Sequence, residues 1–420
     1  MKTWIKKYNI SQDIYKEVIE KDCELKDIFT KLNEIEEFNT LKVLDAMQSV
    51  ELAATDFYSP TGYGYGDVGR EKVEKIYSKI FKTEDALVRP NIASGTHALA
   101  LTLQGVLKYG NHLLSITGTP YDTMQQVIGI TGNEPLSLKE MGISYSEVPL
   151  EDKININEVL KEIKPETKVI LIQRSTGYSL RPAISLEDME FAISKIKELH
   201  PDIIIMVDNC YGEFTQRKEP TEIGADICVG SLIKNIGGGI AISGGYIVST
   251  KDIIHRISNR LTAPGLGKEV GLTYNTTRTT LQGLFLAPKI TSEALKSALL
   301  FSYVFTSRGY ETIPSVNEKR YDIIQAIVLK DPKKVVAFCE GIQKVSAVDS
   351  HVTPVPWPMP GYENDIIMAS GSFIDGSSIE ISADGPLRDP FCVYYQGGLS
   401  YYQSKLACMV VLEKLRQMEN

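Results

Sequence analysis

The stretch ADICVGSLIKNIGGGIAISGGYIV, Ala225 to Val248, decides the fold class and raises the functional question. Residues 226–232 are apolar or small and predict a buried strand, and Lys234 follows at the carboxyl end of that strand. Burying an ammonium group is costly unless it has a partner. The glycines at 237–239 indicate a tight backbone beside a ligand, whereas a lysine that reaches back to the surface is the alternative.

The composition is that of a globular protein. The 420 residues allow two or three domains with large cores. Hydrophobic residues make up 43% of the chain and charged residues 23%, which is ordinary for such proteins. The formal net charge of -8 argues against a nucleic-acid or anionic-membrane partner.

Cysteine and histidine usage indicates neither a disulfide framework nor a metal site. The 6 cysteines form no CxxC pair, and the 5 histidines lack metal-ligand spacing. The N-terminus MKTWIKKYNISQDIYKEV has no apolar segment typical of a secretory signal, and no apolar run is long enough to span a membrane. We therefore expect a cytoplasmic protein.

The middle of the chain alternates between strands and helices. Residues 168–173 and 202–208 are apolar on both faces and predict buried strands. Residues 185–199 between them predict an amphipathic helix that Ser185 and Asp188 cap. Strands of this kind, linked by a helix, predict an α/β fold with a mainly parallel sheet.

The chain divides into three predicted regions. Residues 1–60 are helical, residues 61–290 form the large α/β domain, and residues 291–420 form a smaller α+β domain. Helices are expected in the last region at 292–305, 332–345 and 401–418.

The segment NIASGTHALALTLQGVLKYG has the features of a phosphate site. Ser94, Gly95 and Thr96 precede a predicted helix that runs toward Tyr109, with Gly110 as its stop. A helix N-terminus offers unpaired N–H groups and a positive dipole end to a phosphate. Taken alone, such a start is more often an ordinary helix cap.

Two further residues extend this pattern. Asp208 ends a buried strand, at the sheet edge where ligands of open α/β sheets bind, although a structural carboxylate is an equally good interpretation. Tyr121 follows a strand and could stack on a flat heteroaromatic ring, although a core tyrosine is the commoner outcome.

Together these residues favour pyridoxal 5'-phosphate as the cofactor. A phosphate cradle, a carboxylate for the pyridine nitrogen, a lysine for the aldehyde and a stacking aromatic are what this cofactor needs from a protein. We therefore expect a covalent aldimine on Lys234 and a lowered pKa for its amino group.

The motifs VDNCYGEF, GSLIKNIGGGIAISGGYI, TAPGLGKEVG and GSSIEISADGPLRDPFCVYYQGGLSY carry a family resemblance. The chain resembles fold type I pyridoxal-phosphate enzymes, and within them the bacterial aluminium-resistance or methionine γ-lyase-like family of Cys/Met metabolism. The resemblance covers nearly the whole chain. It implies a mainly parallel seven-stranded sheet sandwiched by helices, with a smaller C-terminal domain.

The resemblance also implies residue roles. Lys234 is the Schiff-base lysine, Asp208 binds the pyridine nitrogen, and Tyr121 stacks on the ring with Cys210 on its opposite face. The phosphate group is expected to contact Ser94, Gly95, Thr96 and Ser231.

The loop YGYGDVGR occupies the place of a family loop that reaches the phosphate of a neighbouring subunit. Tyr63 and Tyr65 are therefore expected to act across the interface of a homodimer or homotetramer. The arginine of the family loop is absent, with Arg70 further along, and Ile233 replaces a hydroxyl residue just before the lysine.

The family's substrate-binding arginine lies in a late strand. Arg388 is our first candidate for the contact with the substrate carboxylate, and Arg174 and Arg181 compete with it. A surface or interdomain salt bridge is the alternative for each.

The expected reaction is carbon–sulfur bond cleavage in cystathionine, cysteine or methionine, by β- or γ-elimination. Lys234 is the expected general base, Asp208 keeps the cofactor nitrogen protonated, and Tyr121 assists proton transfer to sulfur. An aldolase or aminotransferase on the same scaffold is one alternative, because the fold does not select the reaction. A non-catalytic pyridoxal-phosphate binder acting in stress response is the other.

Overall fold

The computed structural model describes residues 2–359, 362, 364–369 and 371–419. The α-helices are α1 Lys2–Lys7, α2 Gln12–Glu24, α3 Lys26–Ser49, α4 Val68–Ile80, α5 Gly95–Val106, α6 Asp122–Ile128, α7 Ile156–Glu162, α8 Leu186–Leu199, α9 Lys251–Leu261, α10 Thr277–Ser307, α11 Pro332–Lys344 and α12 Tyr401–Glu419. The 3₁₀ helices are η1 Ala54–Phe57, η2 Pro220–Ile223 and η3 Asn235–Gly237. The strands are β1 Asp85–Arg89, β2 His112–Ser115, β3 Ser144–Glu147, β4 Thr167–Gln173, β5 Ile204–Asp208, β6 Ile227–Ser231, β7 Gly245–Ser249, β8 Glu311–Ile313, β9 Gln325–Val328, β10 Ile366–Ala369, β11 Ser382–Pro386 and β12 Cys392–Gln396.

The larger sheet has seven strands among the described residues, in the order β1-β7-β6-β5-β4-β2-β3. The strands from β6 to β3 are parallel, whereas β7 pairs antiparallel with both β6 and β1. The predicted α/β class with a mainly parallel sheet is confirmed. The last pair of the β4–β5 register joins Gln173 to Asp208, so the carboxyl ends of these strands meet at one edge.

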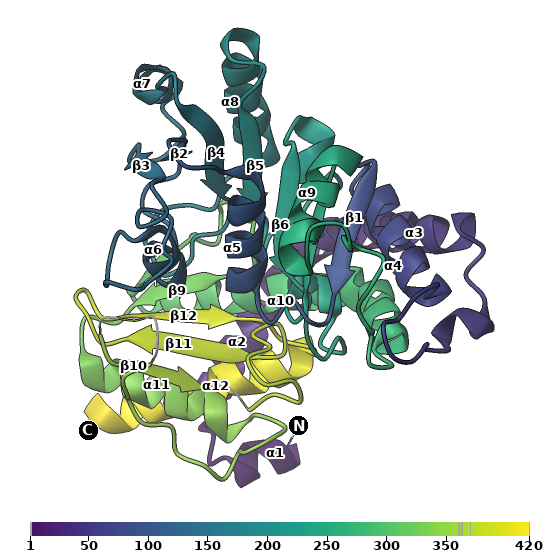
Figure 1. Ribbon diagram of the computed structural model, residues 1–420. Coiled ribbons are helices and arrows are strands. Elements are labelled where there is room, and N and C mark those ends of the chain that lie inside the picture. The colour runs from purple at the N-terminus through teal and green to yellow at the C-terminus, as the bar shows by residue number, and fades with distance from the viewer. Residues whose placement is uncertain (1, 360–361, 363, 370, 420) are drawn as a thin grey trace.

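Helices cover both faces of this sheet, which explains why its strands are apolar at successive positions. One face packs on α5 and α9, with Leu171, Met206 and Val229 among its core residues. The other face packs on α8 through Ile172 and Val207, and further along on α3 and α4. Figure 1 shows α5 and α9 in front of the strands, with α3 and α4 at the right.

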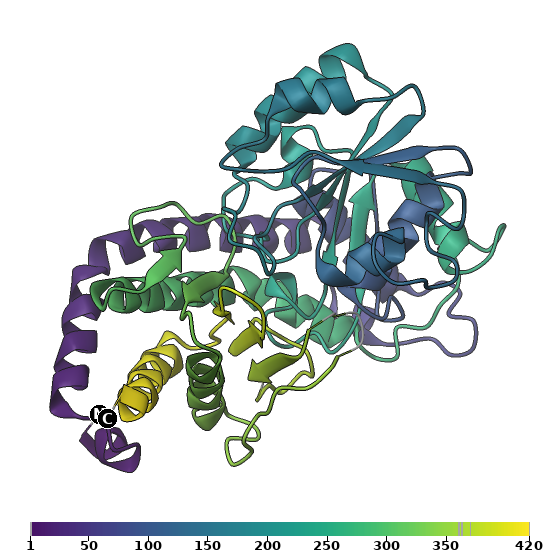
Figure 2. The same cartoon turned by 90° about the vertical axis from the view of Figure 1, so that its left-hand side faces the viewer.

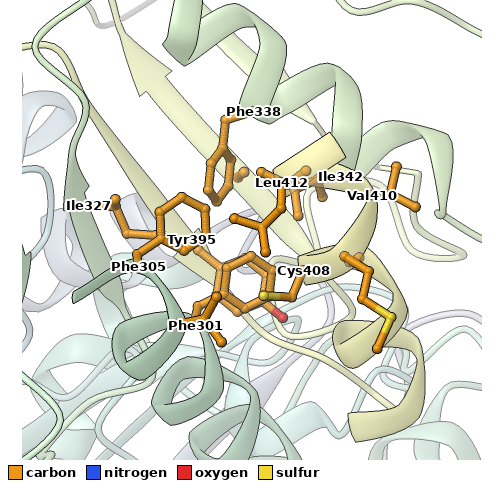
Figure 3. Close-up of a cluster of buried hydrophobic side chains, with 14 of the residues drawn as sticks. Phe301, Phe305, Ile327, Phe338, Ile342, Tyr395, Cys408, Val410 and Leu412 are labelled. Atoms are coloured by element: carbon orange, nitrogen blue, oxygen red, sulfur yellow. The ribbon is translucent and has the colours of Figure 1, made fainter. Parts of the chain in front are cut away.

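The second sheet is antiparallel, in the order β10-β11-β12-β9-β8. Its core lies between the sheet, α10, α11 and α12 and includes several aromatic side chains. Phe301 and Tyr395 stack with ring centroids 4.0 Å apart, and Phe338 lies 5.9 Å from Phe301 (Figure 3). This packing holds β12 against α10 and α11.

The long helix α10 connects the two halves. It packs along α3, as Figure 2 shows, and it also contacts η3, β8, β9 and α12. Residue 290, the predicted boundary between the two larger regions, lies inside α10.

Two predicted helix ends are wrong. The helix expected from residue 292 begins at Thr277, with Pro288 inside it. Packing of Leu284 and Ala287 in the core offsets the hydrogen bond that the proline removes. The helix expected to reach Tyr109 ends at Val106, and Gly110 takes a positive φ of 81° in the turn before β2 instead.

The helices expected at 185–199, 332–345 and 401–418 are confirmed as α8, α11 and α12. None of the helices in the described part of the chain is both long and apolar enough to cross a membrane.

Candidate active site

A cavity of about 200 Å³ lies at the carboxyl edge of the parallel strands. The ends of β4, β5 and β6 meet there, and the start of α5 closes one side. It is lined by Ser94, Gly95, Thr96, Leu99, Tyr121, Thr123, Met124, Gln173, Ser175, Gly177, Asp208, Cys210, Tyr211, Ser231, Ile233, Lys234 and Tyr362. Residues that sequence analysis had selected from four separate segments thus share one cavity.

Lys234 lies three residues beyond the end of β6, where the chain turns into η3. Its Nζ lies 4.0 Å from the ring centroid of Tyr211, which is a cation–π contact. Tyr211 itself has a φ of 71°, a conformation that non-glycine residues rarely adopt and that occurs at functional sites. The backbone therefore holds the Tyr211 ring beside the Lys234 amino group.

The prediction of a lowered pKa for Lys234 is wrong for the polypeptide by itself. Burial alone lowers the pKa of Lys234, but the ionisable side chains of Cys210, Tyr211 and Asp208 outweigh burial and raise it. In the polypeptide alone, these neighbours favour the protonated form of the amino group.

The glycines after Lys234 pack against protein rather than against the cavity. A Cβ on Gly237 would lie 1.7 Å from the carbonyl oxygen of Leu232, and one on Gly238 would lie 2.5 Å from that of Gly283 in α10. The prediction that they flank a ligand is therefore wrong. They let η3 approach α10 closely, and this approach supports the turn that carries Lys234.

Asp208 is a buried carboxylate at the end of β5. Its Oδ1 accepts a hydrogen bond of 3.1 Å from the backbone N–H of Cys210. Burial raises the pKa of Asp208, and the charge of Lys234 opposes that effect. A carboxylate in this position is stabilised by a cationic group placed in the cavity.

The start of α5 has the features that an anion site requires. Ser94 caps the helix by accepting a hydrogen bond of 3.0 Å from the N–H of His97, so the N–H groups of Gly95 and Thr96 keep no intrahelical partner. A Cβ on Gly95 would lie 3.3 Å from Cβ of Ser231. Only glycine leaves that space for a ligand atom.

Tyr121 is the N-cap of α6 and lines the cavity. Its backbone N–H donates to Oε1 of Gln173 at 2.7 Å, and its hydroxyl lies 2.5 Å from that of Tyr362. Cys210 lies in the same cavity, with Sγ 3.5 Å from the position of a Cβ on Gly95.

Three tyrosines at the site were missed by sequence reasoning. Tyr178 and Tyr211 follow β4 and β5 at the carboxyl edge, so their place after a buried strand was a usable signal. Tyr362 ends the Pro-rich stretch TPVPWPMPGY, and no sequence pattern connects it with the strands.

A second cavity of about 220 Å³ adjoins the first and shares Tyr121 and Gln173 with it. Arg388 lines this second cavity, with 42% of its side chain exposed. Its guanidinium donates to the carbonyl of Tyr178 at 3.3 Å and lies 3.8 Å from Asp122.

The two competing arginines are occupied by the protein. Arg174 is fully buried and makes four hydrogen bonds, to Asn209, Gly212, Thr215 and Gln216. Arg181 donates to the backbone carbonyls of Gln173, Ser175 and Pro182. Arg388 is thus the one of the three that faces a cavity.

Tyr63 and Tyr65 lie outside both cavities. They are 75% and 61% exposed, and their ring centroids are 5.8 Å apart. Their loop is held by Arg70, whose guanidinium donates to the carbonyls of Gly64, Glu269 and Gly271. Among the described residues of one chain, neither tyrosine lines the cavity that contains Lys234.

The residues that the structure describes contain no group of three or more His, Cys, Asp or Glu side chains that could hold a metal ion.

Comparison with known proteins places the chain among lyases. The model of the methionine gamma-lyase family matches residues 12–416. The uncharacterized protein YnbB of Bacillus subtilis is 44% identical over 407 residues, covering 96% of this chain and 97% of its own.

Two solved structures are similar over almost the whole chain. The carbon–sulfur lyase involved in aluminum resistance from Clostridium novyi NT has a TM-score of 0.94 at 47% identity, covering 99% of this chain and 98% of its own. A candidate cystathionine beta-lyase involved in aluminum resistance from Clostridium acetobutylicum has a TM-score of 0.95 at 42% identity, with the same coverage.

Proposed function

The chain belongs to the methionine gamma-lyase family, and on that premise we propose that it is a pyridoxal-phosphate-dependent carbon–sulfur lyase of fold type I. Its substrate is a sulfur amino acid such as cystathionine, cysteine or methionine. One observation carries the proposal: a phosphate-type helix start, a buried carboxylate and a lysine from three separate elements line one cavity.

The cavity fits pyridoxal 5'-phosphate, the cofactor that the family implies. The space that a Cβ on Gly95 would fill faces Ser231 and Cys210, so a phosphate oxygen can reach the N–H groups of α5. Ser94, Thr96 and Ser231 add hydroxyl groups. Asp208 would hold the protonated pyridine nitrogen, because burial leaves that carboxylate in need of a cation.

The remaining residues position the chemistry. Lys234 would hold the cofactor covalently through Nζ, while Tyr121 and Cys210 would lie on opposite faces of its ring. When bound, pyridoxal phosphate supplies an electron sink for the α-carbon of an amino acid. Lys234 then accepts the α-proton as general base, and Tyr121 gives a proton to the departing sulfur.

Arg388 is the residue we assign to the substrate carboxylate. Arg174 and Arg181 each donate several hydrogen bonds to the protein, whereas Arg388 lines a cavity that shares Tyr121 and Gln173 with the cavity of Lys234. A planar guanidinium suits bidentate binding of a carboxylate.

A product assay tests the proposed reaction. Purified protein loaded with pyridoxal phosphate is incubated with cystathionine, cysteine and methionine, and thiol, ammonia and 2-oxo acid are measured. Equal amounts of all three support elimination, and the carbon skeleton of the oxo acid separates β- from γ-elimination. Glycine with an aldehyde would identify an aldolase, and conversion that requires an oxo-acid acceptor would identify an aminotransferase. Cofactor binding without conversion of any amino acid would leave only a binding role.

We also propose that the active site is completed by a second copy of the chain. Large apolar side chains are exposed together on the loops 58–68 and 262–276, which are joined by a hydrogen bond from Gly271 N–H to the carbonyl of Tyr63. They are Tyr58, Tyr63, Tyr65, Val68, Leu266 and Tyr274. Such a patch favours an interface, and closed symmetry would give a dimer or a tetramer.

Subunit mixing tests this interface. Tyr65→Phe and Lys234→Ala proteins are each expected to be inactive, and a reassembled mixture is expected to recover part of the activity. Tyr109→Phe, which changes another exposed tyrosine, is the matched control and should behave as wild type. A fully active monomer in sedimentation would contradict the shared site.

The six cysteines are all free, which agrees with the cytoplasmic location that we propose.

A further inference from the structure

A second buried carboxylate stands behind the tyrosines of the site. Asp384 lies on β11 of the smaller sheet and is 8% exposed. The Tyr178 hydroxyl donates to its Oδ2 at 2.7 Å, and the Gln396 amide donates to the same atom at 2.5 Å. Tyr178 lines the cavity of Arg388, so Asp384 reaches that cavity through the Tyr178 hydroxyl.

The ring of Tyr178 packs with the rings of two other tyrosines, Tyr121 and Tyr362. It lies 5.2 Å from that of Tyr121 and 6.0 Å from that of Tyr362. The Tyr178 hydroxyl is among the groups that lower the pKa values of Tyr121 and Tyr362, and the hydroxyls of Tyr121 and Tyr362 lie 2.5 Å apart in a hydrogen bond. The hydroxyl of Tyr394 holds Tyr178 in place by donating to its carbonyl at 2.9 Å.

These tyrosines are neutral near physiological pH. Burial raises the pKa of Tyr121 and Tyr178 well above the ordinary value, and it raises that of Tyr362 as well. A neutral phenol can pass a proton on but cannot accept one without giving up its own.

A lyase acting on amino acids has two proton transfers to arrange besides that at the α-carbon. The substrate arrives as an ammonium ion, which must lose a proton before its nitrogen can act as a nucleophile. The departing sulfur must gain a proton. A group that accepts the first proton and returns it for the second would serve both needs.

We propose that Asp384 is this proton store and that Tyr178 connects it to Tyr121. This inference rests on the proposed carbon–sulfur lyase function. On substrate binding, the ammonium group gives a proton to Tyr121, the Tyr121 proton moves to Tyr178, and the Tyr178 proton moves to Asp384. When the carbon–sulfur bond breaks with its electron pair on sulfur, the same transfers run in reverse and the sulfur leaves as a thiol. The α-proton stays with Lys234, so protons and electrons balance without a further reactant.

The direction of the observed hydrogen bond agrees with this role. Tyr178 donates to Asp384, as required when the carboxylate is the resting acceptor. Burial raises the pKa of Asp384 to about 6, against the hydrogen bonds of Tyr178 and Gln396 and the charge of Lys234. The other titratable groups around it are Tyr211, Tyr362 and Cys339, whose own pKa values are raised by burial.

The test is the pH dependence of kcat/KM for release of thiol. In the wild type, kcat/KM should fall as pH drops below about 6, because a protonated Asp384 cannot accept the ammonium proton. Asp384→Asn should lower kcat/KM about 10²-fold and remove this limb, since loss of an acid–base group costs 10²-fold or more. Asp384→Glu should restore part of kcat/KM, and the fall of kcat/KM at low pH should return. Asp389→Asn, an exposed change in the same hairpin, is the control and should leave both unchanged.

Tyr178→Phe is the second variant. It should also lose the fall of kcat/KM at low pH, although Asp384 is still present. Combining it with Asp384→Asn should cause little further loss, because both changes break one route. A variant that is slower but keeps the wild-type acid limb overturns the proposal and indicates a packing role.

A second measurement does not depend on turnover. In holoenzyme labelled with ¹³C at tyrosine Cζ, the Tyr178 resonance, identified by its absence in Tyr178→Phe, should shift in a step near pH 6. The step should be absent in Asp384→Asn. If thiol is released and the step is missing, the proton store is wrong while the lyase stands. If no amino acid is cleaved, the proposed function fails, and the step still reports whether the carboxyl is coupled to Tyr178.

Discussion

Two buried charged regions at the same sheet edge differ in what their charges contact. Arg174, after β4, makes four hydrogen bonds to protein groups and lies 3.9 Å from the buried carboxylate of Glu219. Lys234, after β6, faces the ring of Tyr211, and within the described residues its Nζ makes no hydrogen bond or ion pair. In the first region the protein supplies hydrogen bonds to both terminal nitrogens of the guanidinium, whereas the second leaves its amino group at a cavity.

The difference separates a structural charge from a functional one. A buried cation is tolerated when hydrogen bonds replace its water, as around Arg174. Glu219 is held in the same way, by Asn209 at 2.9 Å and by the N–H of Phe214 at 3.0 Å. Lys234 and Asp208 lack that degree of compensation, which is the arrangement expected of groups that bind a ligand. Five experiments would break or sharpen this contrast.

The largest effect is expected for Lys234→Ala. Turnover should fall by at least about 10³-fold, as befits loss of the covalent anchor and general base together. The free energy of unfolding should change little, because the amino group makes no hydrogen bond that the fold needs. A thiol-release assay and a denaturant titration measure the two effects, and the visible absorption of the covalently bound cofactor should also disappear.

Borohydride reduction of the wild type, followed by peptide mass mapping, locates the lysine directly. The pyridoxyl group should lie on Lys234. Lys268 is the control, because it is paired with Glu74 at 3.0 Å and Asp85 at 2.7 Å. A label on Lys268 or Lys251, or on no lysine, would remove the basis of the proposed function.

The second effect is on stability. Arg174→Ala should lower the free energy of unfolding by about 3–5 kcal/mol, because it leaves the Glu219 carboxylate buried without a cationic partner. Denaturant unfolding measures this loss, and Arg174→Lys tests whether the planar guanidinium is needed. A loss below about 1 kcal/mol would mean that Arg174 does not stabilise the fold through its contact with Glu219.

A smaller effect is expected for Arg388→Ala, the arginine that borders a cavity. The variant should keep its cofactor but bind amino acids more weakly by about 1.5–3 kcal/mol, the range for a hydrogen bond to a charged group. Spectral titration with amino acids measures the affinity, and the unfolding free energy should stay near the wild-type value. An unchanged titration would exclude this role and return attention to Arg174 and Arg181.

The smallest effect is expected for an ion pair with solvent access. Arg308, the residue directly after α10, makes two hydrogen bonds to Glu17 on α2, at 3.0 and 2.6 Å, with both side chains partly exposed. A double-mutant cycle with Arg308→Ala and Glu17→Ala should give about 0.5–1 kcal/mol, decreasing at high salt. A coupling as large as the loss expected for Arg174→Ala would show that burial does not explain the difference in energy between the Arg174 region and the Arg308–Glu17 pair.

Local patterns carried much of the prediction. The buried strands at 168–173 and 202–208, the helix that Ser185 begins and the helix start at Ser94 depend on neighbouring residues, and the structure has each of them. The convergence of Asp208, Ser231 and Lys234 was also accessible, because the carboxyl ends of parallel strands share one sheet edge.

The sequence by itself therefore determined the fold class and the side of the sheet on which the site lies, since strand periodicity and helix caps are set within a few residues. Only the tertiary structure decided which charges are functional. Whether Arg174 or Arg388 faces a cavity, whether the glycines after Lys234 meet a ligand or α10, and whether Asp384 approaches Tyr178 depend on segments far apart in the chain. Such contacts follow from how the two sheets pack around α10, and that packing leaves no periodic pattern in the sequence.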